Sequence, residues 1–229
     1  MAASHLELRG AVLNREMVIG GQFRPLTDAD ILQIHKASLE ILQTTGVRVE
    51  NATARQIFES AGADISGERV CIPPDMVEDA VATAPAKVLL AGRIEGRDLI
   101  LSGKKVHFGT GGSPINVLDP GETKVRRAKL EDVARLARLA ERLSELDFFV
   151  LPVTPTDIPA EEVAVSRFTA ALLNTRKHIM GGLINLQGAK DVYAMAEYLG
   201  GSADVLRARP FVSCMISWMV SPLTFDSAV

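Results

Sequence analysis

The sequence predicts an α/β protein: a partial (β/α)8 TIM barrel of about four βα units, preceded by a helical segment with a small β patch. After residue 104, apolar runs typical of strands alternate with amphipathic stretches typical of helices. The strand runs are almost continuously apolar, as parallel strands covered on both faces are. They supply about half of a barrel that needs about 250 residues, so we expect a truncated barrel over 105–229.

Residues 1–104 follow a different pattern, in which helices precede short strands. Thr27 and Asp30 are spaced as a capping box, and Gly46 is placed to end the helix that they begin. A second helix is expected from Asn51 to Gly62, and a third after Pro74. Short strands are expected at Arg69–Ile72, Val88–Ala91 and Leu99–Leu101.

The barrel portion is expected to contain four strands and three helices. An open four-stranded sheet is the alternative, but both of its edges would be long, apolar and unprotected. We therefore expect the chain to be a fragment of a longer protein. The expected strands are Val106–Gly109, Phe148–Leu151, Ile179–Ile184 and Phe211–Met219, and the expected helices are Leu130–Leu143, Glu161–Leu173 and Lys190–Leu199.

Composition excludes several classes of function. The net charge of −3 gives no basic surface for nucleic acid. No run of about 18 apolar residues could cross a membrane, and the N-terminus has no apolar signal region. Cys71 and Cys214 stand alone and are expected to be buried, reduced thiols. We expect a cytoplasmic protein.

The sequence contains an ordered set of distinctive stretches: Leu26-Thr27, Thr45-Gly46-Val47, His107-Phe108-Gly109-Thr110-Gly111-Gly112-Ser113, Val117-Leu118-Asp119, Leu130 to Ala140 (LEDVARLARLA), Thr156-Asp157-Ile158-Pro159 and Lys177-His178-Ile179. Together they resemble the trimethylamine methyltransferase family, from about residue 25 to the last residue. Family members are about twice as long as this chain. Lys129 departs from the family pattern: a helix-capping Thr or Ser is expected there, and its loss costs about 1 kcal/mol.

The resemblance implies transfer of a methyl group from a tertiary or quaternary amine, such as trimethylamine or a betaine, to the Co(I) corrinoid (cobalamin) of a partner protein. No cofactor would be bound directly, no metal ligands are assigned, and the catalytic residues stay unknown. We expect a homo-oligomer and no activity from this chain alone. Two other readings stay open: an inactive fragment or interaction module, and a barrel enzyme that binds a phosphate ligand.

In such barrels the site forms at the carboxyl ends of the strands, which nominates four loops. The first is Gly109, Thr110, Gly111, Gly112 and Ser113, where glycines let backbone N–H groups approach an anion such as a betaine carboxylate. A tight turn without ligand is the alternative. The loop is not a P-loop, because no Lys-Ser or Lys-Thr follows the glycines.

The other three loops offer polar or aromatic groups. Thr156 and Asp157 could pair with a substrate ammonium, although Asp157 could instead cap the helix that follows it. Asn185 follows Gly181-Gly182 and could bind polar substrate atoms. Trp218 could face a quaternary ammonium, with core packing as the alternative.

The histidines are weaker candidates. His107, early in the first expected strand, could transfer a proton, but a core histidine with satisfied hydrogen bonds is the stronger reading. We assign no chemistry to His178, which begins the third expected strand.

Overall fold

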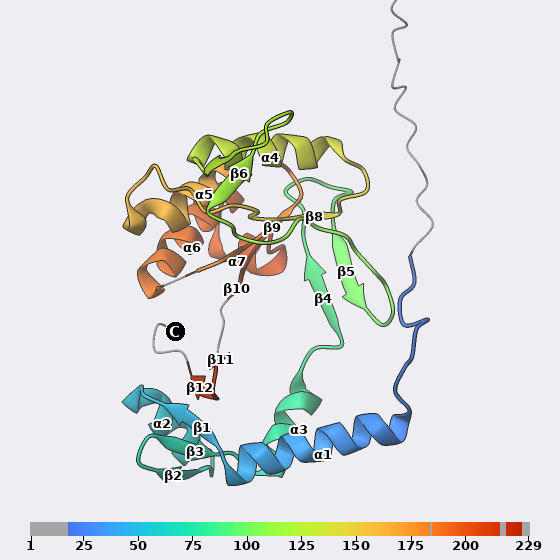
Figure 1. The fold of residues 1–229 in the computed structure, drawn as a ribbon, viewed down its shortest axis with the longest axis vertical. Coiled ribbons are helices and arrows are strands. Elements are labelled where there is room, and N and C mark those ends of the chain that lie inside the picture. Colours follow the sequence, from blue (N-terminus) through green and yellow to red (C-terminus); the bar gives the residue numbers. More distant parts are fainter. Residues whose placement is uncertain (1–17, 184, 216–218, 226–229) are drawn as a thin grey trace, which may run out of the picture.

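The computed structural model describes residues 18–183, 185–215 and 219–225. Figure 1 shows two groups of elements, joined by the chain between α3 (Pro74–Thr83) and β4 (Lys87–Leu90). The lower group holds three helices and a small sheet, and the upper group holds parallel strands with helices around them. The expected mixed α/β class is confirmed.

The first helix, α1 (Asp28–Thr44), begins at the predicted capping box. Thr27 Oγ1 accepts a hydrogen bond from the Asp30 N–H at 3.2 Å, and the Asp30 carboxylate accepts one from the Thr27 N–H at 2.8 Å. Gly46 follows the helix at a φ of 66°, a conformation that favours glycine. The other helix of this group that has a side-chain cap is α2 (Ala52–Ser60), capped by Asn51.

The small sheet of the lower group joins strands from residues 47–71 to the last described segment, 219–225. Its order is β11-β12-β1-β3-β2, with β12 parallel to β1. Val49 and Val70 are fully buried in its core, against which Phe225 packs. The segment 219–225 therefore pairs with the N-terminal strands. The bounds are β1 (Val47–Val49), β2 (Asp64–Ser66), β3 (Arg69–Cys71), β11 (Met219–Val220) and β12 (Thr224–Phe225).

The upper group is built on three parallel strands in chain order, β8-β9-β10. Gly109 adds a single parallel bridge to Phe148 on the outer side of β8. Consecutive strands therefore lie side by side with helical crossovers, as in the first part of a (β/α)8 barrel, although the described residues form no closed barrel. The bounds are β8 (Phe148–Val150), β9 (His178–Gly182) and β10 (Val212–Met215).

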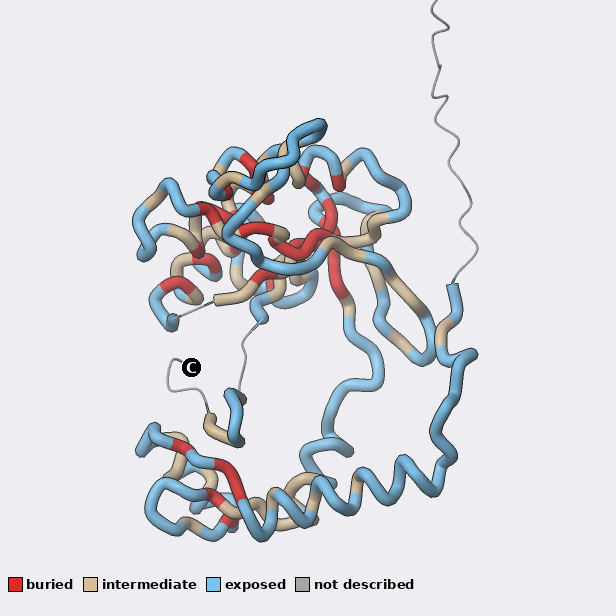
Figure 2. The backbone as a smooth tube through the Cα atoms, in the orientation of Figure 1, coloured by how far each residue is buried: buried red, intermediate tan, exposed pale blue. Residues whose placement is uncertain are grey.

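Helices and one hairpin cover this sheet. Figure 2 shows the buried residues gathered on the strands and on the sides of the helices that touch them, whereas α1 is exposed along most of its length. No described helix is long and apolar enough to cross a membrane. The bounds are β4 with β5 (Leu99–Ser102), α4 (Leu130–Arg142), η1 (Ala160–Glu162), α5 (Val163–Leu172), α6 (Leu186–Gly200) and α7 (Ala203–Ala208).

Three strand predictions are wrong in extent. Of the strand expected at Val106–Gly109, only a bridge at Gly109 is found. The backbone N–H groups before it donate elsewhere, that of Val106 to the Val18 carbonyl and that of Phe108 to the Asp147 carboxylate. The strand expected at Phe211–Met219 ends at Met215, and Met219–Val220 pairs with β12 in the other sheet. The strand expected at Ile179–Ile184 ends at Gly182.

An antiparallel hairpin not predicted from sequence, β6 (Asn116–Leu118) and β7 (Val125–Arg127), lies beside the start of α4. Arg126 fixes it there, because its guanidinium bonds the carboxylates of both Asp119 and Asp132 at 2.6 to 2.9 Å. Asp132 is buried, and its hydrogen bonds with Arg126 hold its pKa down at about 2.

This ion cluster predicts acid sensitivity. The folded-state pKa of Asp132 lies below its ordinary value of 3.8, so its contribution is complete above pH 3.8 and is lost as pH falls towards 2. The full contribution is about 2 kcal/mol, of which about half is lost at pH 3. Urea unfolding should show that Asp132→Asn destabilises less at pH 3 than at pH 6. The exposed Asp204→Asn is the control, and an equal Asp132→Asn effect at both pH values would refute the assignment.

Candidate functional site

The loop 109–113 lies against the carboxyl end of β8. Thr110 Oγ1 donates to the Val150 carbonyl at 2.6 Å, and the Ser113 hydroxyl lies 3.4 Å from the Leu151 carbonyl. A Cβ on Gly109 would come within 2.4 Å of the Phe148 ring, so this glycine is needed for packing. A Cβ on Gly111 would meet no atom within 4 Å, so the space beside it is open.

A buried arginine that the sequence analysis missed lies at this loop. Arg167, on α5, is 6% exposed, and its Nη2 donates to Ser113 Oγ and to the Leu151 carbonyl, both at 3.2 Å. Burial lowers the pKa of its guanidinium. The signal was present in the sequence: Arg167 lies on the same helix face as Ala164, Phe168 and Ala171, all of which are buried.

The second loop contributes to helix capping. The Leu130 N–H at the start of α4 donates to Asp157 Oδ1 at 2.9 Å, and the Lys129 N–H donates to Asp132 at 2.9 Å. The expected loss of capping at Lys129 is therefore wrong, because acidic side chains supply the acceptors. Thr156 is tied to the Ala128 carbonyl through both its N–H, at 2.9 Å, and its hydroxyl, at 3.1 Å.

Replacing Asp157 by alanine tests this capping role. The variant should lose about 1 kcal/mol of unfolding free energy, because the Leu130 N–H loses its acceptor. Asp157→Asn keeps a side-chain oxygen and should retain most of the stability. Thermal or urea unfolding measures both, and equal stability of Asp157→Ala and the parent chain would rule the cap out.

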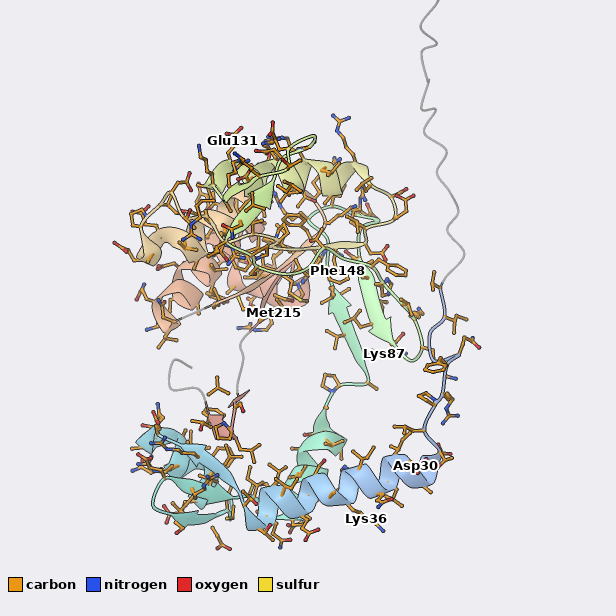
Figure 3. The ribbon with its side chains drawn as sticks, in the orientation of Figure 1. Asp30, Lys36, Lys87, Glu131, Phe148 and Met215 are labelled. Carbon is orange, nitrogen blue, oxygen red and sulfur yellow. The ribbon has the colours of Figure 1, made fainter. Side chains whose placement is uncertain are left out.

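The third loop begins α6. The Asn185 Oδ1 accepts the Gly188 N–H at 2.7 Å, so its oxygen caps the helix. Figure 3 labels Met215 at the lower border of the upper group and Phe148 among its strands. Because β8 and β9 are parallel, the loops that follow them lie at the same carboxyl edge of the sheet, and Thr154 in the first of these loops donates to the Ser113 carbonyl at 3.2 Å. Trp218 lies outside the described residues.

The two described histidines of this region are engaged with protein groups. His107 is half-buried, with Nδ1 3.7 Å from an Asp147 carboxylate oxygen. His178 is fully buried, and burial lowers its pKa. Its Nδ1 lies 3.1 Å from the Ala91 carbonyl, which can only accept, so Nδ1 carries the proton, and Nε2 lies 2.8 Å from Ser213 Oγ. His178 thus connects the end of β4 to β10.

Within the described part of the chain, no group of three or more His, Cys, Asp or Glu side chains could hold a metal ion. The polar groups gathered at the carboxyl edge are hydroxyls, an amide, a carboxylate and the Arg167 guanidinium. Such a set can orient a small polar molecule by hydrogen bonds and charge.

Comparison with known proteins identifies the family. Residues 8–229 match the family model described as trimethylamine methyltransferase (MTTB). The chain is 35% identical over 192 residues to the trimethylamine methyltransferase MttB of Desulfitobacterium hafniense (strain DSM 10664 / DCB-2), covering 83% of this chain and 39% of that protein. It is 30% identical over 223 residues to the MttB of Methanosarcina thermophila, covering 93% and 45%.

A third relative has another substrate in its name. The glycine betaine methyltransferase of Desulfitobacterium hafniense (strain Y51) is 27% identical over 212 residues, covering 90% of this chain and 44% of that protein. The chain thus spans less than half the length of these three relatives. The chain belongs to the trimethylamine methyltransferase family.

Proposed function

We propose that this chain forms the front part of an amine methyltransferase, which moves a methyl group from a tertiary or quaternary amine to the corrinoid of a partner protein. The observation that supports the proposal is the parallel pairing of β8 and β9, because the loops after these strands, with Thr156, Asp157 and Asn185, then follow the same carboxyl edge of the sheet against which the loop 109–113 lies. This is the edge at which (β/α)8 barrels bind substrate. The names of the relatives, trimethylamine and glycine betaine methyltransferases, support this substrate class.

The residues of this chain would bind and orient the amine. The loop 109–113 would offer backbone N–H groups and hydroxyls, Asp157 a carboxylate for the ammonium, and Asn185 its amide. Trp218, when its ring faces the methyl groups, would add a cation–π contact. The corrinoid would supply the Co(I) electron pair that accepts the methyl group. Closing the site against water would favour departure of the neutral amine.

The architecture that we propose is a partial (β/α)8 barrel over 105–229, preceded by the N-terminal region 1–104. The order Gly109, β8, β9, β10 in one parallel sheet supports it, because a barrel adds its strands in chain order. We propose that the protein acts in the cytoplasm as a homo-oligomer. Both cysteines, Cys71 and Cys214, are free thiols, which agrees with a reducing compartment. The expectation that both are buried is wrong, because Cys71 is half-buried and Cys214 is exposed.

A non-catalytic interaction module is the second candidate. The observation that favours it is α1, which buries none of its residues and exposes Ile31, Leu32 and Ile34. Exposed apolar surface of this kind marks contact with another protein surface. This reading predicts binding of a partner without turnover of an amine.

Demethylation of the amine separates the two candidates. The longest chain that the reading frame encodes is mixed with the reduced corrinoid protein and with trimethylamine or glycine betaine, and the demethylated amine is measured by mass spectrometry. The proposal predicts its formation and weaker binding of the amine by Trp218→Ala. Absence of product with every amine would favour the interaction module. We further propose that residues 1–229 alone give no turnover, and product from them would refute that.

A further inference from the structure

Arg167 differs from Arg126 and Arg209, two arginines that also lie close to the sheet and hairpins. Arg126 bonds two carboxylates through its three guanidinium nitrogens, and Arg209 bonds one through two nitrogens, at distances of 2.6 to 2.9 Å. Arg167 is more deeply buried than either and makes no ion pair with a described residue. Its two hydrogen bonds go to neutral oxygens, those of Ser113 and Leu151. A positive charge is therefore buried beneath the loop 109–113 without a described counter-charge.

The guanidinium also has an unused donor. Its Nε is buried and has no hydrogen-bond partner among the described residues. A buried donor without an acceptor costs about 1–3 kcal/mol, and more when the group is charged. Buried charged donors without an acceptor occur mainly where a ligand or a reaction requires the group.

The geometry around Arg167 fits a carboxylate. Nε and Nη2 form one edge of the guanidinium plane, which is a fork that matches the two oxygens of a carboxylate. Nη2 is held by Ser113 Oγ at 3.2 Å, and that hydroxyl is itself 3.4 Å from the Leu151 carbonyl. Both contacts are long, so the hydroxyl can be displaced at little cost. Gly111 and Ser113 are exposed, so the loop that contacts Nη2 borders solvent.

We propose that Arg167, together with Ser113, forms a carboxylate-binding subsite beneath the loop 109–113. The inference rests on the proposed function and specifies its substrate class: an amine that carries a carboxylate, a betaine, in preference to a simple methylamine. The carboxylate takes Nε and Nη2 of Arg167, and the Ser113 hydroxyl moves to donate to it. The ammonium end then projects towards the carboxyl edge of the strands.

Binding measurements on the longest encoded chain test the subsite. Isothermal titration with glycine betaine, acetate, trimethylamine and inorganic phosphate compares the parent with Arg167→Met and Arg167→Lys. We expect glycine betaine to bind at least about 10-fold more weakly to both variants, because Lys keeps the charge but loses the fork. Trimethylamine binding should be unchanged. Arg138→Gln, on the outer face of α4, removes one exposed positive charge and is the matched control.

The outcomes distinguish the subsite from the proposed function. If acetate binds to the parent and not to Arg167→Met while no amine binds at all, the subsite stands and the methyltransferase proposal falls. If amines bind equally to the parent and to Arg167→Met, the subsite is refuted and the function stands. Phosphate bound more tightly than acetate or betaine would also refute it, in favour of a phosphate ligand. If Arg167→Met fails to fold, Arg167→Lys and Ser113→Ala test the subsite instead. Ser113→Ala should weaken the binding of glycine betaine and leave the binding of trimethylamine unchanged.

Discussion

Replacing Lys177 by methionine is expected to lower the unfolding free energy by about 3 kcal/mol or more. Lys177 is fully buried, and its ammonium donates to three carbonyls at the end of α4, those of Ala140, Leu143 and Leu146, at 2.5 to 2.7 Å. The carbonyls of Ala140 and Leu143 also accept backbone N–H groups, those of Leu143 and Leu146, at 3.3 Å, so Lys177 supplies a further hydrogen bond to each. Methionine fills similar space but removes all three hydrogen bonds that the buried ammonium makes.

Urea unfolding gives the measurement for this prediction. Lys36→Met is the control, because Lys36 points away from α1 into solvent and its replacement should change the unfolding free energy by less than about 0.5 kcal/mol. A loss of less than about 1 kcal/mol in Lys177→Met would show that water or another donor satisfies the carbonyls, and the capping role would be wrong.

Gly181→Ala is expected to cost about 2–3 kcal/mol by overpacking. A Cβ there would lie 2.5 Å from Leu151 Cδ1 and 2.9 Å from Phe168 Cζ. Both side chains are fully buried, so neither has room to move. The core therefore requires glycine at position 181. The space for a ligand to approach the backbone lies beside the next residue, Gly182.

The neighbouring residue provides the matched control. A Cβ on Gly182 would have the Met215 carbonyl as its nearest atom, at 4.0 Å, so Gly182→Ala should be neutral or gain a few tenths of a kcal/mol. Thermal unfolding of the two variants makes the comparison. Equal midpoints would mean that the sheet shifts to accept a side chain at position 181.

Local patterns in the sequence were enough to place most helices. The Thr27–Asp30 box and the apolar spacing of Leu130 to Ala140 each mark one helix, and both helices are found where expected. The hairpin of β6 and β7 was missed because Arg126, Asp119 and Asp132 stabilise it through ion pairs between separate segments, which no local periodicity reveals. The pairing of 219–225 with β1 is likewise a contact between distant parts of the chain.

The site was predicted in outline, from the rule that barrel loops at the carboxyl ends of strands bind ligands. That rule locates 109–113, but it cannot separate Gly109, which packs on Phe148, from Gly111, which faces open space. Asp157 was expected either to bind an ammonium or to cap the helix that follows it, whereas its carboxylate caps α4, the preceding helix. The rule does not point to Arg167, because this residue lies on the helix α5 and not in a loop.

The most direct test of the central claim is isothermal titration of glycine betaine and trimethylamine into the longest encoded chain and its Gly111→Leu variant. A leucine at position 111 should fill the open space of the loop without disturbing packing, because no atom lies within 4 Å of its Cβ position. An amine site at this loop predicts binding by the parent, loss of binding in Gly111→Leu, and equal thermal midpoints. Equal affinities in the two chains, or no binding of any methylated amine to either, would contradict it.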